Sequence, residues 1–166
     1  IAFFAGLNIS KIVSCCGTLF SAASSSYISL LFVVDELLWV GLFYGFFVMI
    51  VLAFWLKNSA LTIFANAMFL IFAIIALIVF FSPYVYELPT HRCPFCLLQK
   101  DYYYVGYLLY ILLFSGTFYG IAGAVLSLLS KEKMHFSRLS LGFTTLYLLM
   151  ISAYPMVYFI RNGVWL

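Results

Sequence analysis

Long apolar runs separated by short polar interruptions make up most of the chain. The first run covers residues 37–56, between Asp35-Glu36 and Lys57-Asn58, and the later runs cover residues 60–81, 102–129 and 139–160. A helix that crosses a bilayer needs about 20 apolar residues. The pattern therefore predicts four spans at about residues 37–56, 60–81, 97–129 and 139–160. The third span begins before its apolar run because its helix is expected to start a turn earlier.

The segment before Asp35 is also apolar but contains small polar residues. Asn8, Ser10 and Lys11 interrupt it early, and residues 24–26 are three consecutive serines. It fits a complete span, the end of a truncated span or a partly re-entrant segment. Because backbone inside a membrane must satisfy its own hydrogen bonds, we expect mostly helix with a break near residues 24–26. The predicted fold is an all-α polytopic transmembrane helical bundle of four to five spans, in a single membrane-embedded domain over residues 1–166.

Composition supports this prediction. Apolar residues form 67% of the chain and charged residues 8%, whereas soluble domains have about 45–50% and about 25%. This excludes a water-soluble fold, and it also excludes a disordered chain, which needs low hydrophobicity. A formal net charge of +3 spread along the chain provides no basic stripe for nucleic acid. The expected partner is the lipid bilayer.

The few basic residues predict an orientation. Those on one side of the predicted bundle are Lys57, Lys131, Lys133 and Arg138, and those on the other are Arg92, Lys100 and Arg161. Basic residues accumulate on the cytoplasmic side of membrane proteins. We therefore expect the second group to face the periplasm of a bacterial inner membrane, or an organelle lumen.

Two cysteine pairs carry the most distinctive chemistry. One is Cys15-Cys16 and the other is Cys93-Pro94-Phe95-Cys96. Proline is favoured at the first position of a helix, so we expect Cys93 to cap a helix and Cys96 to lie one turn further on the same face, within disulfide reach. The helix dipole and neighbouring cations stabilise a thiolate, and the candidates here are His91, Arg92 and Lys100. The CxxC pair is predicted to be a reactive dithiol.

Three uses of these thiols stay open: redox exchange, metal binding and a passive structural bridge. In the redox case, Cys15 or Cys16 would exchange with Cys93 or Cys96 through a mixed disulfide. In the metal case, the set Cys15, Cys16, His91, Cys93 and Cys96 would hold copper or mercury, because thiolates select soft ions. Mercuric ion transport proteins similarly carry adjacent cysteines in their first span.

The order of a cysteine segment, two spans and then a CxxC motif on the outer side resembles the vitamin K epoxide reductase family. Residues 16–21, Cys-Gly-Thr-Leu-Phe-Ser, are similar to that family's segment of a cysteine followed by Phe and Ser. The family spaces its shuttle cysteines several residues apart, whereas Cys15 and Cys16 are adjacent here. The stretch from Cys93 to Lys100, with Gln99 and Lys100 after the motif, resembles the disulfide-bond formation protein B. That protein keeps a second pair in a later loop, where residues 131–138 here have no cysteine.

Either resemblance implies a helical bundle around a quinone. Cys96 would face the quinone and Cys93 would be its exchange partner. Cys16, with Cys15, would be the shuttle that meets a thioredoxin-like or other thiol protein on the outer side.

Tyr103, Tyr107 and Tyr110 follow the CxxC motif at three- and four-residue steps. On one helical face they would line a quinone slot beneath Cys96, although tyrosines also gather at membrane interfaces without any ligand. We predict a membrane thiol–disulfide oxidoreductase that exchanges electrons between protein thiols and a quinone, without a metal. The alternative is a membrane protein that binds or transports soft heavy metals.

Two further features concern packing. Gly116, Gly120 and Gly123 place small residues on one face of the third span, and such faces let helices approach closely in lipid. Asn66 interrupts the second span and is expected to form hydrogen bonds between helices. Asp35 and Glu36 are expected to be solvated at the membrane surface.

Overall fold

The computed structural model describes residues 35–88, 92–129 and 135–165, with Cys15, Cys16 and His91 outside these ranges. All regular elements in the described residues are helical. In chain order, they are α1 (Glu36–Leu56), α2 (Ser59–Ala76), the π-helical turn η4 (Leu77–Phe81), α3 (Ser82–Tyr86), the 3-10 turns η5 (Cys96–Leu98) and η6 (Lys100–Tyr102), α4 (Val105–Leu129) and α5 (His135–Asn162).

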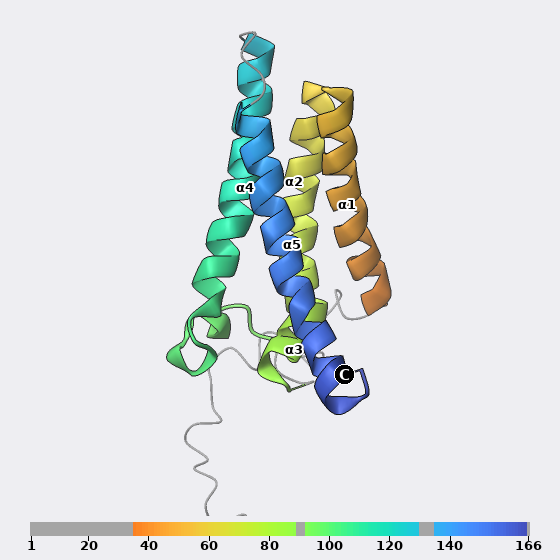
Figure 1. The fold of residues 1–166 in the computed structure, drawn as a ribbon, viewed down its shortest axis with the longest axis vertical. Helices are drawn as coiled ribbons and strands as arrows, with labels where there is room; N and C mark the ends of the chain where they lie inside the picture. Colours follow the sequence, from red (N-terminus) through yellow and green to blue (C-terminus); the bar gives the residue numbers. More distant parts are fainter. Residues whose placement is uncertain (1–34, 89–91, 130–134, 166) are drawn as a thin grey trace, which may run out of the picture.

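The long helices form two antiparallel pairs. α1 packs on α2, α4 packs on α5, and α2 and α4 join the pairs (Figure 1). Four helical stretches are long and apolar enough to cross a membrane, including the continuous stretch Ser59–Tyr86. The expected all-α bundle is confirmed, and the protein is an integral membrane protein. The further span considered for residues 1–34 lies outside the described residues.

Side-chain caps fix where the first two long helices begin. The Asp35 carboxylate accepts from the amide of Leu37 at 3.1 Å, and the Asn58 side chain accepts from the amide of Leu61 at 3.2 Å. Such caps satisfy donors that the first turn of a helix leaves unpaired. Lys57 ends α1 in the left-handed conformation, with φ of 52°, so the chain reverses into α2 within two residues.

Small residues of α4 bring three helices together, as predicted. A methyl group on Gly116 would lie 2.8 Å from Cγ2 of Thr144 in α5, and one on Gly120 would lie 2.5 Å from Cγ of Asn66 in α2. Asn66 is fully buried; it donates to the Thr62 carbonyl at 2.8 Å and accepts from Ser140 of α5 at 3.4 Å. The predicted interhelical role of Asn66 is confirmed.

The second span extends beyond the predicted end at Ser82-Pro83. Pro83 has no amide hydrogen for the carbonyl four residues earlier, and a proline ring normally breaks a helix there. Here the backbone widens into η4, and the Ser82 hydroxyl donates to the Leu77 carbonyl at 2.6 Å. The helix then continues through α3 until Glu87, whose φ is 54°. This extra turn carries Tyr86 into the interior.

Candidate functional site

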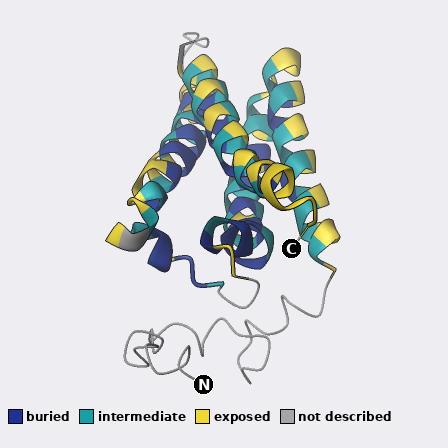
Figure 2. Ribbon diagram, turned by 60° about the horizontal axis from the view of Figure 1, so that its bottom comes forward, coloured by how far each residue is buried: buried dark blue, intermediate teal, exposed yellow. Residues whose placement is uncertain are grey.

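The CxxC motif lies at the end of the bundle where α1 and α4 begin and α3 and α5 end (Figure 1). Pro94 and Phe95 form a turn, and Cys96 opens the short 3-10 turn η5. We call residues 92–98 the cysteine turn. Figure 2 brings this end forward and shows that α3 and η5 there are largely buried.

The expected α-helix opening at Pro94 is wrong, and so is the predicted start of the third span at residue 97. Gln99 is extended, with ψ of 157°, and Tyr103 and Tyr104 are left-handed, with φ of 53° and 55°. Regular helix begins only at Val105. Lys100 therefore does not share a helical face with Cys96.

The physical reason for this break is the packing of Leu97 against Gly106. Leu97 is fully buried, and a Cβ atom on Gly106 would lie 2.8 Å from the Leu97 Cβ and 2.9 Å from its carbonyl carbon and oxygen. Glycine is thus needed at position 106 because the cysteine turn folds back onto the first turn of α4. A straight helix through residues 94–105 would carry Leu97 away from this contact.

Both cysteines of the motif are buried thiols. Cys93 is 1% exposed and Cys96 is 3% exposed, and both belong to the main hydrophobic core. A tight turn brings its first and fourth residues close together, and a disulfide needs Cα atoms about 4.4–6.8 Å apart. The backbone between Cys93 and Cys96 is therefore of a kind that a disulfide can close.

Two tyrosine hydroxyls hold the cysteine turn from different helices. The Tyr86 hydroxyl donates to the Cys93 carbonyl, and the Tyr110 hydroxyl donates to the Pro94 carbonyl at 2.9 Å. α3 and α4 therefore both anchor the backbone that carries the thiols.

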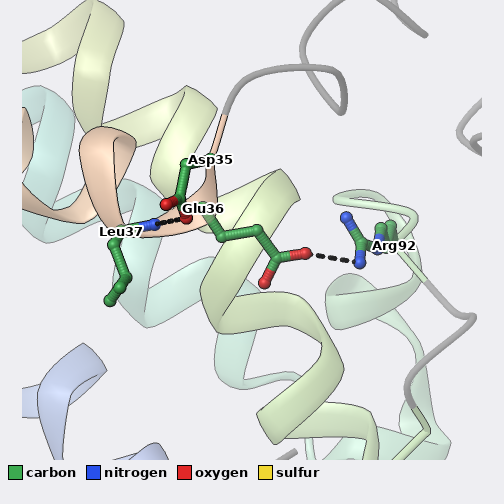
Figure 3. A network of polar contacts seen from close by, with 4 residues as sticks. All are labelled: Asp35, Glu36, Leu37 and Arg92. Carbon is green, nitrogen blue, oxygen red and sulfur yellow. Dashed lines mark hydrogen bonds and ion pairs between the residues drawn. The ribbon is translucent and has the colours of Figure 1, made fainter.

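An ion pair ties the cysteine turn to α1. The Arg92 guanidinium lies 2.8 Å from the Glu36 carboxylate, next to the Asp35 cap on Leu37 (Figure 3). The side chains of Arg92 and Glu36 are 19% and 44% exposed. The expectation that Glu36 is merely solvated is corrected, because this pair joins residues far apart in the sequence. The charge of Arg92 beside Cys93 is balanced by Glu36.

An apolar groove of about 710 Å³ adjoins the cysteine turn. Pro94 and Phe95, the residues between the cysteines, form part of its wall. The rest of the wall comes from Leu98 of the cysteine turn and from α2, η4 and α4, which include Ile78, Tyr107 and Tyr110. A groove of this size and character fits a mainly apolar small molecule.

The three predicted quinone-slot tyrosines are only partly brought together. Tyr107 and Tyr110 line the groove, whereas Tyr103 is 93% exposed and is not among its lining residues. The prediction assumed one helical face through all three, but α4 starts after Tyr103. Sequence reasoning missed Tyr86, because Ser82-Pro83 indicated that the span had already ended.

The metal interpretation rests mainly on residues outside the described ranges. Cys15, Cys16 and His91 all lie there, so neither their distance from Cys93 and Cys96 nor a shared site is defined. Among the described residues, no three or more His, Cys, Asp or Glu side chains gather as a metal site would require.

Comparison of the chain with models of protein families, with curated proteins and with solved structures finds no match.

Proposed function

We propose that the protein is a membrane thiol–disulfide oxidoreductase that exchanges electrons between protein thiols and a quinone through Cys93 and Cys96, like the vitamin K epoxide reductase and disulfide-bond formation protein B families. The observation that carries the proposal is that the two buried thiols flank Pro94 and Phe95, which form a wall of the apolar groove. A lipid-soluble molecule in the groove would therefore lie against the two residues that join the thiols.

The residues around the groove fit a quinone. Its volume of about 710 Å³ lies within the usual range of small-molecule sites, which is roughly 300–1,000 Å³. Phe95, Ile111 and Phe114 line it and are at least half exposed on the bundle surface. In a membrane this surface meets lipid, so the groove is open to molecules dissolved in the bilayer.

The chemistry assigned to the two cysteines is balanced. As the S–S bond forms, Cys93 and Cys96 together lose two electrons and two protons, and they regain them when a partner's dithiol becomes a disulfide. When bound, a quinone supplies a two-electron, two-proton couple with its quinol. Burial of both thiols keeps water from the reacting sulfur atoms. The hydroxyl bonds from Tyr86 and Tyr110 hold the turn beside the groove.

Exchange with a bulky protein partner needs a further carrier, because Cys93 and Cys96 are buried. We assign this role to Cys16 with Cys15. The partner would be a thioredoxin-like or other thiol protein on the outer side.

Charge supports placing the cysteine turn at the outer face of a bacterial inner membrane, toward the periplasm. The sequence carries Lys57, Lys131, Lys133 and Arg138 on the far side of the bundle, against Arg92, Lys100 and Arg161 on the side of the cysteine turn. The side with more Lys and Arg is preferentially cytoplasmic.

Redox trapping tests the proposal. The Cys15→Ser/Cys16→Ser variant isolates the CxxC pair, and a thiol-alkylating mass tag followed by mass spectrometry distinguishes its dithiol from its disulfide. We expect a short-chain quinone to convert the dithiol into a Cys93–Cys96 disulfide and to form one equivalent of quinol. A quinone that leaves both thiols open to the tag would refute the proposal.

A groove-filling variant tests where the quinone binds. Ile111→Trp places a large ring in the groove, and Leu128→Trp places the same ring on a comparably exposed site of α4 away from it. We expect Ile111→Trp to raise the KM for quinone at least severalfold and Leu128→Trp to leave it unchanged. Equal KM values in the two variants would show that the quinone does not bind in the groove.

A further inference from the structure

A second pocket, of about 550 Å³, lies at the end of the bundle opposite the cysteine turn. Its walls come from the last turn of α1, the start of α2, the end of α4 and the start of α5. It therefore lies where the two helix pairs meet at the membrane surface. Figure 1 shows these helix ends at its top.

The polar groups of this pocket are suited to an anion. Lys57, Arg138 and Ser137 line it, and none of these side chains forms a hydrogen bond or ion pair with a described residue. No acidic side chain is among the lining residues. Among the described residues, the pocket thus presents two positive charges and a hydroxyl donor without a compensating carboxylate.

The other hydroxyls of the pocket are already engaged as donors. The Ser127 hydroxyl donates to the Ala124 carbonyl at 2.7 Å and is hydrogen-bonded to the Ser59 hydroxyl. Thr62 donates to the Asn58 carbonyl at 2.9 Å. The bond between Ser59 and Ser127 ties α2 to α4. Recognition of an anion is therefore left to Lys57, Arg138 and Ser137.

The remaining lining residues are apolar: Ala53, Phe54, Trp55 and Ala124. An apolar wall cannot bind a fully hydrated ion. It can contact the glycerol and acyl carbon atoms that adjoin the phosphate of a phospholipid. We propose that this pocket binds the phosphate headgroup of an anionic phospholipid. Basic pockets between transmembrane helices bind such headgroups in the cytoplasmic leaflet. The proposal does not depend on the thiol chemistry at the other end.

Trp55 provides a local reporter, because it is one of the lining residues. In a Trp39→Phe/Trp165→Phe background it is the sole tryptophan of the chain. The full chain is reconstituted in phosphatidylcholine vesicles that contain either brominated phosphatidylglycerol or brominated phosphatidylcholine. Bromine quenches tryptophan fluorescence at close range, so the ratio of the two quenching curves gives the lipid preference at the pocket.

We expect phosphatidylglycerol to be preferred, with about a fivefold contribution from each basic side chain. Lys57→Gln/Arg138→Gln should lower the preference to about that of a neutral lipid, and Lys57→Arg/Arg138→Lys should retain it. The matched control, Lys100→Gln/Arg161→Gln, removes two positive charges from the other end and should leave the preference unchanged.

Three results would overturn the proposal. The first is equal quenching by the two lipids in the background protein, which needs no pocket variant. The second is a preference that survives Lys57→Gln/Arg138→Gln or disappears equally in the control. The third is loss of the preference on addition of millimolar inorganic phosphate but not of chloride at matched ionic strength, which would identify a site for soluble phosphate.

Discussion

Gly106→Ala tests whether close packing on α4 holds the cysteine turn in place. The added methyl group would lie 2.8 Å from the Leu97 Cβ and 2.9 Å from its carbonyl carbon and oxygen. Ordinary contact begins at 3.4 Å, so Leu97 must retreat by about 0.6 Å from the added methyl group. Two of these three atoms belong to the backbone, and a change of side-chain rotamer therefore cannot relieve the contact. The whole turn, with Cys96 next to Leu97, has to move.

The expected cost follows from two opposing effects. Overpacking a core costs about 1–3 kcal/mol, whereas alanine stabilises a helix interior relative to glycine by about 1 kcal/mol, a gain that is smaller at Gly106 because it is the second residue of α4. Gly142→Ala is the control for helix propensity, because a methyl group there meets nothing within 4 Å and the residue lies inside α5. The free energies of unfolding of the two variants should differ by about 1–4 kcal/mol, with Gly106→Ala the less stable.

Two measurements check this expectation. Unfolding in mixed detergent micelles, followed by helical circular dichroism, compares the free energies. Maleimide labelling in a Cys15→Ser/Cys16→Ser background reports how often the cysteine turn opens, and a loss of 1 kcal/mol corresponds to labelling about fivefold faster. If Gly106→Ala and Gly142→Ala unfold alike and label at the same rate, the packing of Leu97 on α4 does not position the dithiol.

Three other substitutions test the remaining contacts. Glu36→Gln removes the partner of Arg92 and should cost less than about 1 kcal/mol in the same unfolding assay, because the pair is partly exposed; a loss that persists at 1 M salt would contradict the ion-pair explanation. Gly120→Ala should cost about 1–3 kcal/mol by displacing the buried Asn66, and a double-mutant cycle with Asn66→Ala should abolish most of that cost. Tyr110→Phe removes one hydrogen bond, worth about 1 kcal/mol, and should speed maleimide labelling severalfold; unchanged labelling would separate this hydroxyl from the stability of the turn.

The helical bundle was predictable because polar residues are scarce in this chain. Asp35 and Asn58 cap the first two long helices next to the charged and polar positions that interrupt the apolar runs. Asn66 was identified as a helix-joining residue because a buried amide in lipid needs partners. These inferences need only the local sequence and the knowledge that the chain lies in a membrane, so they can be made without a structure.

The cysteine turn was not predictable from the same rules. Pro94 after Cys93 favours a helix start locally, but the burial of Leu97 on Gly106 prevails over that preference. The pairing of Glu36 with Arg92 depends on the tertiary arrangement of α1 and the turn. A single sequence contains no signal for contacts of this kind, because neither partner follows a local pattern that involves the other.

The two tyrosine hydroxyls explain how an irregular turn can exist at the end of an apolar bundle. In an α-helix from residue 94 onward, amides four residues later would satisfy the first carbonyl groups. Here the phenols of Tyr86 and Tyr110 donate to the carbonyls of Cys93 and Pro94 instead. Irregular backbone at membrane depth is tolerated only when such groups are satisfied by protein or water. Since its proton is committed to the Pro94 carbonyl, the Tyr110 hydroxyl can only accept from a ligand in the groove, and any hydrogen bond donated to a ligand there must come from another group.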